Sequence, residues 1–141
     1  MLGHILTGPI RINTAKINQV LQVDIIDIKL RQDWGYNFIR PLSGGLPGEF
    51  HETTKMTIRL DNEAQEGELP WGTRLPLRPF FGVMGCAPPS QWGMISSIQP
   101  RAHGGNMDNK ELIPGTTLYL PIFYDRPNFS AGDRHGCQGD G

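Results

Sequence analysis

Alternating hydrophobic and polar positions recur along this chain and predict strands rather than helices. The clearest run covers residues 55–60, where every second residue is apolar. Residues 20–30 alternate as well, but the phase slips by one residue at Ile25–Ile26, which is typical of a β-bulge. The pattern predicts a chain built on strands that have one apolar and one polar face.

Other segments predict strands by different signals. Phe80–Cys86 is an uninterrupted apolar run with the length of a buried strand. Its glycines, Gly82 and Gly85, indicate that another backbone or a ligand approaches closely. Prolines within residues 74–79 and 116–123 place these two extended segments at sheet edges.

The composition changes this picture only by adding turns. The 141 residues include 18 glycines and 12 prolines, which indicates many tight connections, while 38% hydrophobic residues suffice for a core. We therefore expect a mainly β protein, sandwich-like or barrel-like, with little helix. At this length, residues 1–141 are expected to form a single domain.

Charge and hydropathy exclude several kinds of partner. The formal net charge is −1 and no basic patch is present, so nucleic acid is not expected to bind. No apolar stretch is long enough to span a bilayer, so no membrane partner is expected.

The first residues lack the pattern of a signal peptide, which predicts a cytoplasmic protein. Cys86 and Cys137 could form one disulfide, but reduced thiols are the expectation there.

A polar, glycine-containing segment, Gln99–Asp108, has almost no apolar surface to bury. Its double glycine, Gly104–Gly105, can adopt dihedral angles that other residues avoid, so His103 and Asp108 could turn back toward one point. Imidazole and carboxylate together suit a metal ion or a proton transfer. A polar surface turn explains the same residues. Asp108 could also cap a single helical turn, with Glu111 as its capping partner.

A second polar segment occupies residues 132–141. Asp133 and His135 are two positions apart, so on an extended backbone they point to the same face. Such a pair is suited to half of a metal site or to an acid–base pair. The presence of two His/Asp segments in one small chain favours a functional site over two unrelated surface turns.

Several motifs in this order together resemble the acetamidase/formamidase family. The segments that carry the resemblance are Leu6–Ile10, Asp33–Asn37, Gly82–Pro88, His103–Asp108, Gly115–Pro121 and Phe129–Asp133, followed by His135 and Gln138–Gly141. Members of this family are considerably longer than 141 residues and usually carry a Glu after the last motif. The resemblance therefore implies a β domain of that family truncated at both ends.

The resemblance also implies an activity. The family hydrolyses short linear amides, such as formamide and acetamide, to a carboxylate and ammonia, so a small amide is the expected substrate. In the full-length family a homo-oligomer is expected. A divalent metal would suit this chemistry, with zinc as the first choice and calcium as the alternative, and no organic cofactor is implied.

Residues of both polar segments are the candidates for this chemistry. We expect His103, Asp133 and His135 to converge as metal ligands. The proton transfers would fall to His103, Asp133, Asp108 or Asp140, with one of the last two holding the water or relaying the proton.

Three further residues are candidates for binding the substrate. Asn106 would donate a hydrogen bond to the amide carbonyl oxygen. Trp34 and Tyr36 would form the wall of a small pocket, since each offers apolar contact and one hydrogen-bond donor. A surface loop whose aromatic residues cover the core explains the same two residues.

Two other classes of protein fit some of these features. One is an inactive truncated β domain or a non-catalytic metal-binding module, which predicts the same fold and no turnover. The other is a cupin-like metal-binding barrel, which usually has a His-x-His pair and a downstream Glu. Here Asp133 stands at the first position of that pair and no such Glu follows, so the cupin interpretation is the weaker one.

Overall fold

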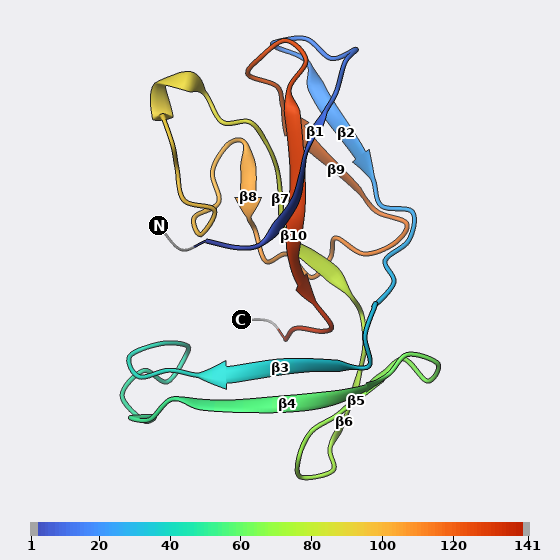
Figure 1. Cartoon of the computed structure of the whole chain (residues 1–141), viewed down its shortest axis with the longest axis vertical. Coiled ribbons are helices and arrows are strands. Elements are labelled where there is room, and N and C mark those ends of the chain that lie inside the picture. Colours follow the sequence, from blue (N-terminus) through green and yellow to red (C-terminus); the bar gives the residue numbers. More distant parts are fainter. Residues whose placement is uncertain (1–2, 140–141) are drawn as a thin grey trace. The chain divides into compact units, whose positions relative to one another are not determined.

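The computed structural model describes residues 3–139, which are built almost entirely of antiparallel strands (Figure 1). In chain order the elements are β1 (Leu6–Arg11), β2 (Val20–Asp24), β3 (Trp34–Ile39), β4 (Thr54–Asp61), β5 (Glu66–Glu68), β6 (Arg74–Pro76), β7 (Phe80–Cys86), the 3-10 turn η1 (Ser90–Trp92), β8 (Gly104–Asn106), β9 (Thr117–Pro121) and β10 (Asn128–His135). They pair in three sheets, ordered β1-β10-β7-β8, β2-β9 and β3-β4-β5-β6. The predicted mainly β class with little helix is confirmed.

The chain divides into two compact units. The first unit comprises Met1–Ile28 and Pro79–His135, and the second comprises Lys29–Arg78 and Gly136–Gly141. The β1-β10-β7-β8 sheet and the β2-β9 ribbon belong to the first unit, and the β3-β4-β5-β6 sheet belongs to the second. That residues 1–141 act as one domain stays a prediction.

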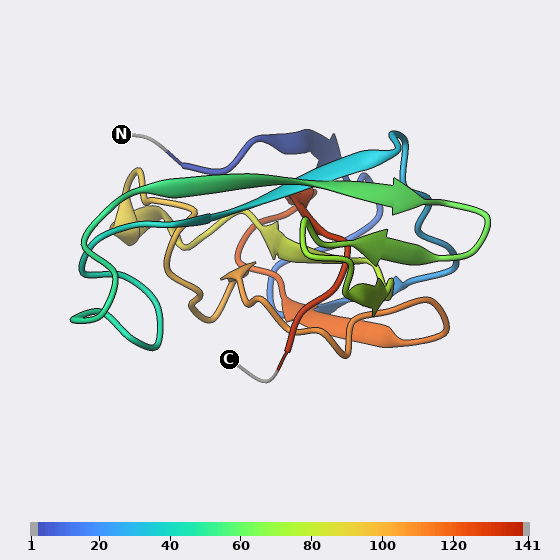
Figure 2. The same cartoon turned by 90° about the horizontal axis from the view of Figure 1, so that it is seen from below.

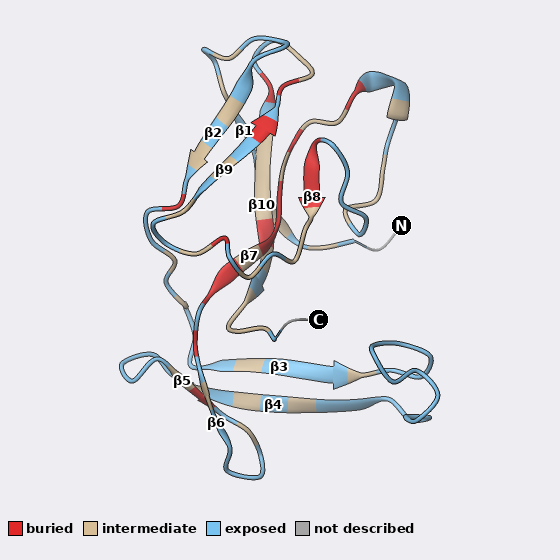
Figure 3. Ribbon diagram, turned by 180° about the vertical axis from the view of Figure 1, so that it is seen from behind, coloured by how far each residue is buried: buried red, intermediate tan, exposed pale blue. Residues whose placement is uncertain are grey.

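Strand β7 lies inside the larger sheet of the first unit, between β10 and β8. Five of its seven residues are buried, and Phe80 has no exposed surface. Figure 3 shows this burial along β7 and into β8. A strand covered on both faces needs apolar or very small side chains throughout, and this explains the unbroken apolar run. The predicted buried strand is confirmed.

The core of the first unit is formed where residues after β2 meet β7. Ile25, Met84 and Leu112 form its buried centre, and Leu118 of β9 packs against it. The predicted strand over residues 20–30 is wrong in its length, because β2 ends at Asp24. The phase change marks the end of the strand: Ile25 turns into the core, whereas Ile26 is 88% exposed.

The helical turn predicted after Asp108 is wrong. Residues 109–116 form turns without a helix. The amide of Glu111 is bonded to the side chain of Asn109, with Asn109 Oδ1 accepting at 3.0 Å. Pro114 lacks the amide hydrogen that a continuing helix would need.

The second unit is a meander of four antiparallel strands, in which β3 and β4 form a long hairpin (Figure 2). The alternation at residues 55–60 is confirmed, since the apolar positions of β4 are half-buried and the polar ones exposed. The proline-containing strand β6 lies at the sheet edge, as predicted. Within residues 3–139, no helix has the length and apolar character needed to cross a membrane.

Candidate functional site

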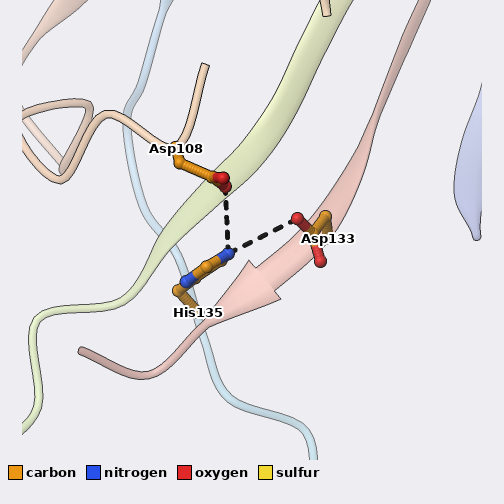
Figure 4. A group of neighbouring side chains, drawn as sticks. All are labelled: Asp108, Asp133 and His135. Carbon is orange, nitrogen blue, oxygen red and sulfur yellow. Dashed lines mark hydrogen bonds and ion pairs between the residues drawn. The ribbon is translucent and has the colours of Figure 1, made fainter. Parts of the chain in front are cut away.

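Three side chains of the first unit converge: Asp108, Asp133 and His135, here called the His135 cluster (Figure 4). His135 Nε2 lies 3.3 Å from Asp108 Oδ1 and 3.4 Å from Asp133 Oδ2. One potential ligand atom from each residue lies within 4.8 Å of the other two. All three residues are partly buried, so the cluster is shielded yet open to solvent.

The strands around β7 bring the cluster together. Asp133 and His135 are both on β10, as the two-residue spacing suggested. The pairs Gly132–Val83 and Arg134–Phe81 flank Asp133, so Asp133 lies opposite Gly82 in the register. On the other side of β7, the amide of Asp108 donates to the carbonyl oxygen of Gly82 at 3.1 Å. Gly82 is therefore the common neighbour of both segments.

Gly82 leaves the space into which the cluster points. A Cβ atom at this position would lie 2.5 Å from Asp108 Oδ1, 2.7 Å from Asp133 Oδ2 and 2.9 Å from His135 Nε2. Real Cβ atoms essentially never come so close to another heavy atom. The glycine is needed here because three polar atoms, not a neighbouring backbone, occupy the volume of its missing side chain.

The backbone of both aspartates is in the left-handed region, with φ of +44° at Asp108 and +53° at Asp133. Aspartate tolerates this conformation better than most residues, but it still has a cost. Such conformations gather at functional sites, where the surrounding structure holds them. Two of the three members of the cluster carry this signature.

Neighbouring side chains hold the cluster in place. Asn106 Nδ2 donates to Asp108 Oδ2 at 3.1 Å. The ring of Phe80 stacks on the imidazole of His135, with 4.7 Å between centroids and 23° between planes. Asn106, proposed from sequence as a substrate donor, thus uses one of its two N–H groups to orient Asp108.

A residue that sequence reasoning missed also faces the cluster. His4 Nε2 lies 3.7 Å from Asp133 Oδ2. The sequence shows His4 as an isolated histidine near the start of the chain, without the glycine and aspartate neighbours of the other candidates. The pairing of β1 with β10, in which Leu6 lies opposite Gly132, and the hydrogen bond to Ser97, 93 residues away, bring it to the site. No local signal could have identified it.

His103, like His4, lies outside the group of ligand atoms found among the described residues. The residue is 7% exposed, and its ring contacts Trp92 edge-to-face, with centroids 5.9 Å apart. Burial lowers the pKa of His103, and the positive charge of Arg101 lowers it further. His103 lines a cavity of about 320 Å³ together with Val83, Cys86 and Ser97. The structure therefore does not bring His103 together with Asp133 and His135 as ligands.

The other candidates from the sequence lie elsewhere. Trp34 and Tyr36 are on β3 of the second unit, 46% and 56% exposed. Tyr36 stacks on Phe38, and Lys55 lies over its ring. Their role as a pocket wall stays a prediction. Asp140 lies outside the described residues.

Both cysteines are free thiols, Cys86 in the first unit and Cys137 in the second. Burial raises the pKa of each of them. Neither thiol belongs to the cluster.

The donor set of the His135 cluster fits a divalent cation. At 3.3 and 3.4 Å, its N–O separations exceed those of good hydrogen bonds. The single hydrogen on Nε2 also cannot form a good hydrogen bond to both carboxylates at once. Ligand bonds of about 2.1 Å in a tetrahedral zinc site would separate neighbouring ligand atoms by about 3.4 Å. The two separations from His135 Nε2 therefore match two edges of such a site.

With this geometry established, comparison with known proteins assigns the chain to a class. The model of the acetamidase/formamidase family matches residues 1–95 and 93–141. The chain therefore belongs to this family.

Individual relatives agree with the assignment. The chain is 26% identical to a formamidase of Methylophilus methylotrophus, with 98% of this chain and 46% of the formamidase covered. Its fold matches the crystal structure of an acetamidase from Bacillus halodurans with a TM-score of 0.88 and 36% identity, covering 96% of this chain and 44% of that one. A predicted acetamidase/formamidase from Thermoanaerobacter tengcongensis gives a TM-score of 0.89 at 30% identity, with the same coverage. The chain thus spans less than half the length of these relatives.

Proposed function

We propose that the His135 cluster is the divalent-cation site of an enzyme that hydrolyses short linear amides, such as formamide and acetamide. The observation that carries the proposal is the convergence of Asp108, Asp133 and His135 over Gly82, in a chain of the acetamidase/formamidase family. Zinc is the first choice because the site mixes imidazole with carboxylate, and calcium, which prefers oxygen ligands alone, is the alternative.

The residues of the cluster would bind the cation and face the substrate. When bound, a divalent cation supplies Lewis acidity, which polarises an amide carbonyl and activates water. All three residues would hold the cation, and the Asp108 side chain is 42% exposed, compared with 29% for Asp133 and 27% for His135. Asp108 is therefore the member most accessible to a substrate, and Asn106 fixes its orientation.

Amide hydrolysis needs one proton moved from water to nitrogen. Water adds to the carbonyl carbon and loses a proton, the C–N bond breaks, and the nitrogen gains a proton and leaves as ammonia. Asp108 is suited to accept the first proton and return it to the nitrogen. His103, which also carried a catalytic role in the sequence interpretation, is assigned no step here because it lies outside the cluster.

The proposal also includes a substrate, an assembly and a location. A small amide is the substrate, a homo-oligomer is the assembly of the whole protein, and the cytoplasm is its location. None of these requires an organic cofactor or a nucleic-acid partner.

Ammonia release from formamide and acetamide tests the function, with zinc content measured on the same sample. We expect Asp108→Asn to lower turnover by about 100-fold or more, as loss of a general acid–base does. His51→Ala is the control, because His51 is exposed in a loop of the second unit.

The zinc content separates the alternatives. Turnover that survives Asp108→Asn would contradict the catalytic role. Stoichiometric zinc without any turnover would instead favour the non-catalytic metal-binding module.

A further inference from the structure

We infer that His4 is a fourth ligand of the cation site, and that Ser97 positions it. The inference rests on the cation site proposed above and adds two residues, His4 and Ser97, from two segments that the sequence motifs left out. His4 approaches Asp133 from the start of the chain, so the ligands would come from three separate segments.

Ser97 fixes the ring of His4 through one hydroxyl oxygen. The backbone amide of His4 donates to Ser97 Oγ at 2.9 Å, and Nδ1 of the ring lies 3.1 Å from the same oxygen. A hydroxyl oxygen has two lone pairs, so it can accept both hydrogen bonds. These two contacts hold both the backbone and the side chain of His4 against one residue.

This arrangement is compatible with the tautomer that binds a metal through Nε2. With the hydrogen on Nδ1 donated to Ser97, Nε2 carries the free lone pair, which is the form that binds a metal. Ligating histidines usually donate their other ring N–H to a neighbouring group in this way. The structure supplies that partner for His4.

The separation between His4 Nε2 and Asp133 Oδ2 agrees with two neighbouring ligands rather than with a hydrogen bond. At 3.7 Å, it is too long for a hydrogen bond. It is close to the separation of about 3.4 Å between neighbouring ligands of a tetrahedral zinc ion. His4 is not in the group whose ligand atoms all lie within 4.8 Å of one another, so its ring would move toward the other members when the cation binds. The His4 side chain is 24% exposed, similar to the 27% of His135. The two imidazoles therefore face Asp133 Oδ2 from similarly shielded positions.

Zinc affinity, measured by competition with a chromophoric chelator, tests the inference on the purified chain. We expect His4→Ala to weaken binding by about 100-fold, because a ligand is removed. Ser97→Ala keeps the imidazole and loses only its positioning partner, so a loss of about 10-fold is expected. His51→Ala, which removes an exposed histidine, should leave the affinity unchanged.

Cobalt(II) absorption provides a second readout that does not depend on activity. The visible bands of the cobalt-loaded chain should shift and change in intensity on His4→Ala, because the set of ligands changes. Circular dichroism of each variant checks that the chain is folded.

The outcomes distinguish this inference from the proposed function. If the unmodified chain binds zinc and His4→Ala binds it equally well with an unchanged cobalt spectrum, His4 is not a ligand, while the three-residue site stands. If the unmodified chain binds neither metal, the cation site and the role of His4 are both overturned.

Discussion

At the residue scale, the site depends on the absence of a side chain at Gly82. The three polar atoms of the His135 cluster occupy the volume of that missing side chain. They are the ends of flexible side chains, so a larger residue could displace them without disturbing the strands. Gly82 thus matters to the site more than to the fold.

Gly82→Ala is therefore expected to abolish tight zinc binding while changing stability little. Its methyl group would separate Asp108, Asp133 and His135 by displacing their ends. Zinc titration and urea unfolding of the same sample measure the two effects. Gly45→Ala is the matched control, because no atom lies within 4 Å of the added Cβ there. Zinc affinity that survives in Gly82→Ala would show that the three atoms do not need this space.

The sequence predicts part of this site because some of its residues are close to one another, or to characteristic glycines, along the chain. Asp133 and His135 are two positions apart, and Asp108 follows a double glycine, so composition and spacing identify them as candidates. His103 looks the same by these criteria, but its side chain turns into a buried, largely apolar environment. His4 reaches the site only through tertiary contacts. The spacing of residues along the sequence could neither distinguish His103 from the members of the His135 cluster nor identify His4.

At the element scale, the short strand β8 owes its position to glycine. Gly104 and Gly105 have φ of +93° and +99°, a region that other residues rarely adopt. A Cβ on Gly104 would collide with the carbonyl oxygen of Met84 on β7 and lie 3.1 Å from Gly85 Cα. These contacts are with backbone, which cannot move aside. The double glycine therefore allows β8 to pack closely against β7, and this places Asp108 next to Gly82.

Gly104→Ala is accordingly expected to destabilise the first unit by about 1–3 kcal/mol, the range for inserting a methyl group where no space exists. Urea unfolding followed by circular dichroism measures this change. Gly45→Ala again serves as the control. A loss of less than about 0.5 kcal/mol would mean that the two strands separate easily.

The elements were predictable where one physical signal dominates. Alternation identified β4, and continuous apolar character identified β7, because both follow directly from which faces are covered. The end of β2 was not predictable, since Ile25 and Ile26 are both apolar and only the tertiary fold decides which of them is buried. The helical turn after Asp108 was wrongly predicted, because the side chain of Asn109, and not that of Asp108, accepts a hydrogen bond from the amide of Glu111.

At the scale of the whole molecule, stability is expected to depend on pH through His103. Burial, followed by the charge of Arg101, holds the pKa of His103 below the ordinary value for histidine, which is about 6.5. The unfolded chain therefore takes up this proton more readily than the folded one, and stability falls as the pH decreases below about 6.5.

Urea unfolding at pH 7.5 and 5.5 tests this dependence. The unmodified chain should lose more stability between the two pH values than His103→Gln, which has no proton to gain. Equal losses in both proteins would show that other groups cause the acid sensitivity. The comparison uses differences, so any constant cost of removing the buried imidazole cancels.

The whole molecule also sets the context of the site. The chain belongs to the acetamidase/formamidase family and spans less than half the length of its relatives. Among the described residues, the His135 cluster lies wholly within the first unit. Cation binding can therefore be tested on this chain directly.

Calorimetric titration with zinc of the unmodified chain and of the Asp108→Asn/Asp133→Asn double variant tests the central claim most directly. We expect one equivalent of zinc to bind the unmodified chain and no tight binding to the variant, because the variant keeps the volume of both side chains and loses their charge. Equal binding by both proteins, or no binding by a folded unmodified chain, would contradict a cation site at Asp108, Asp133 and His135.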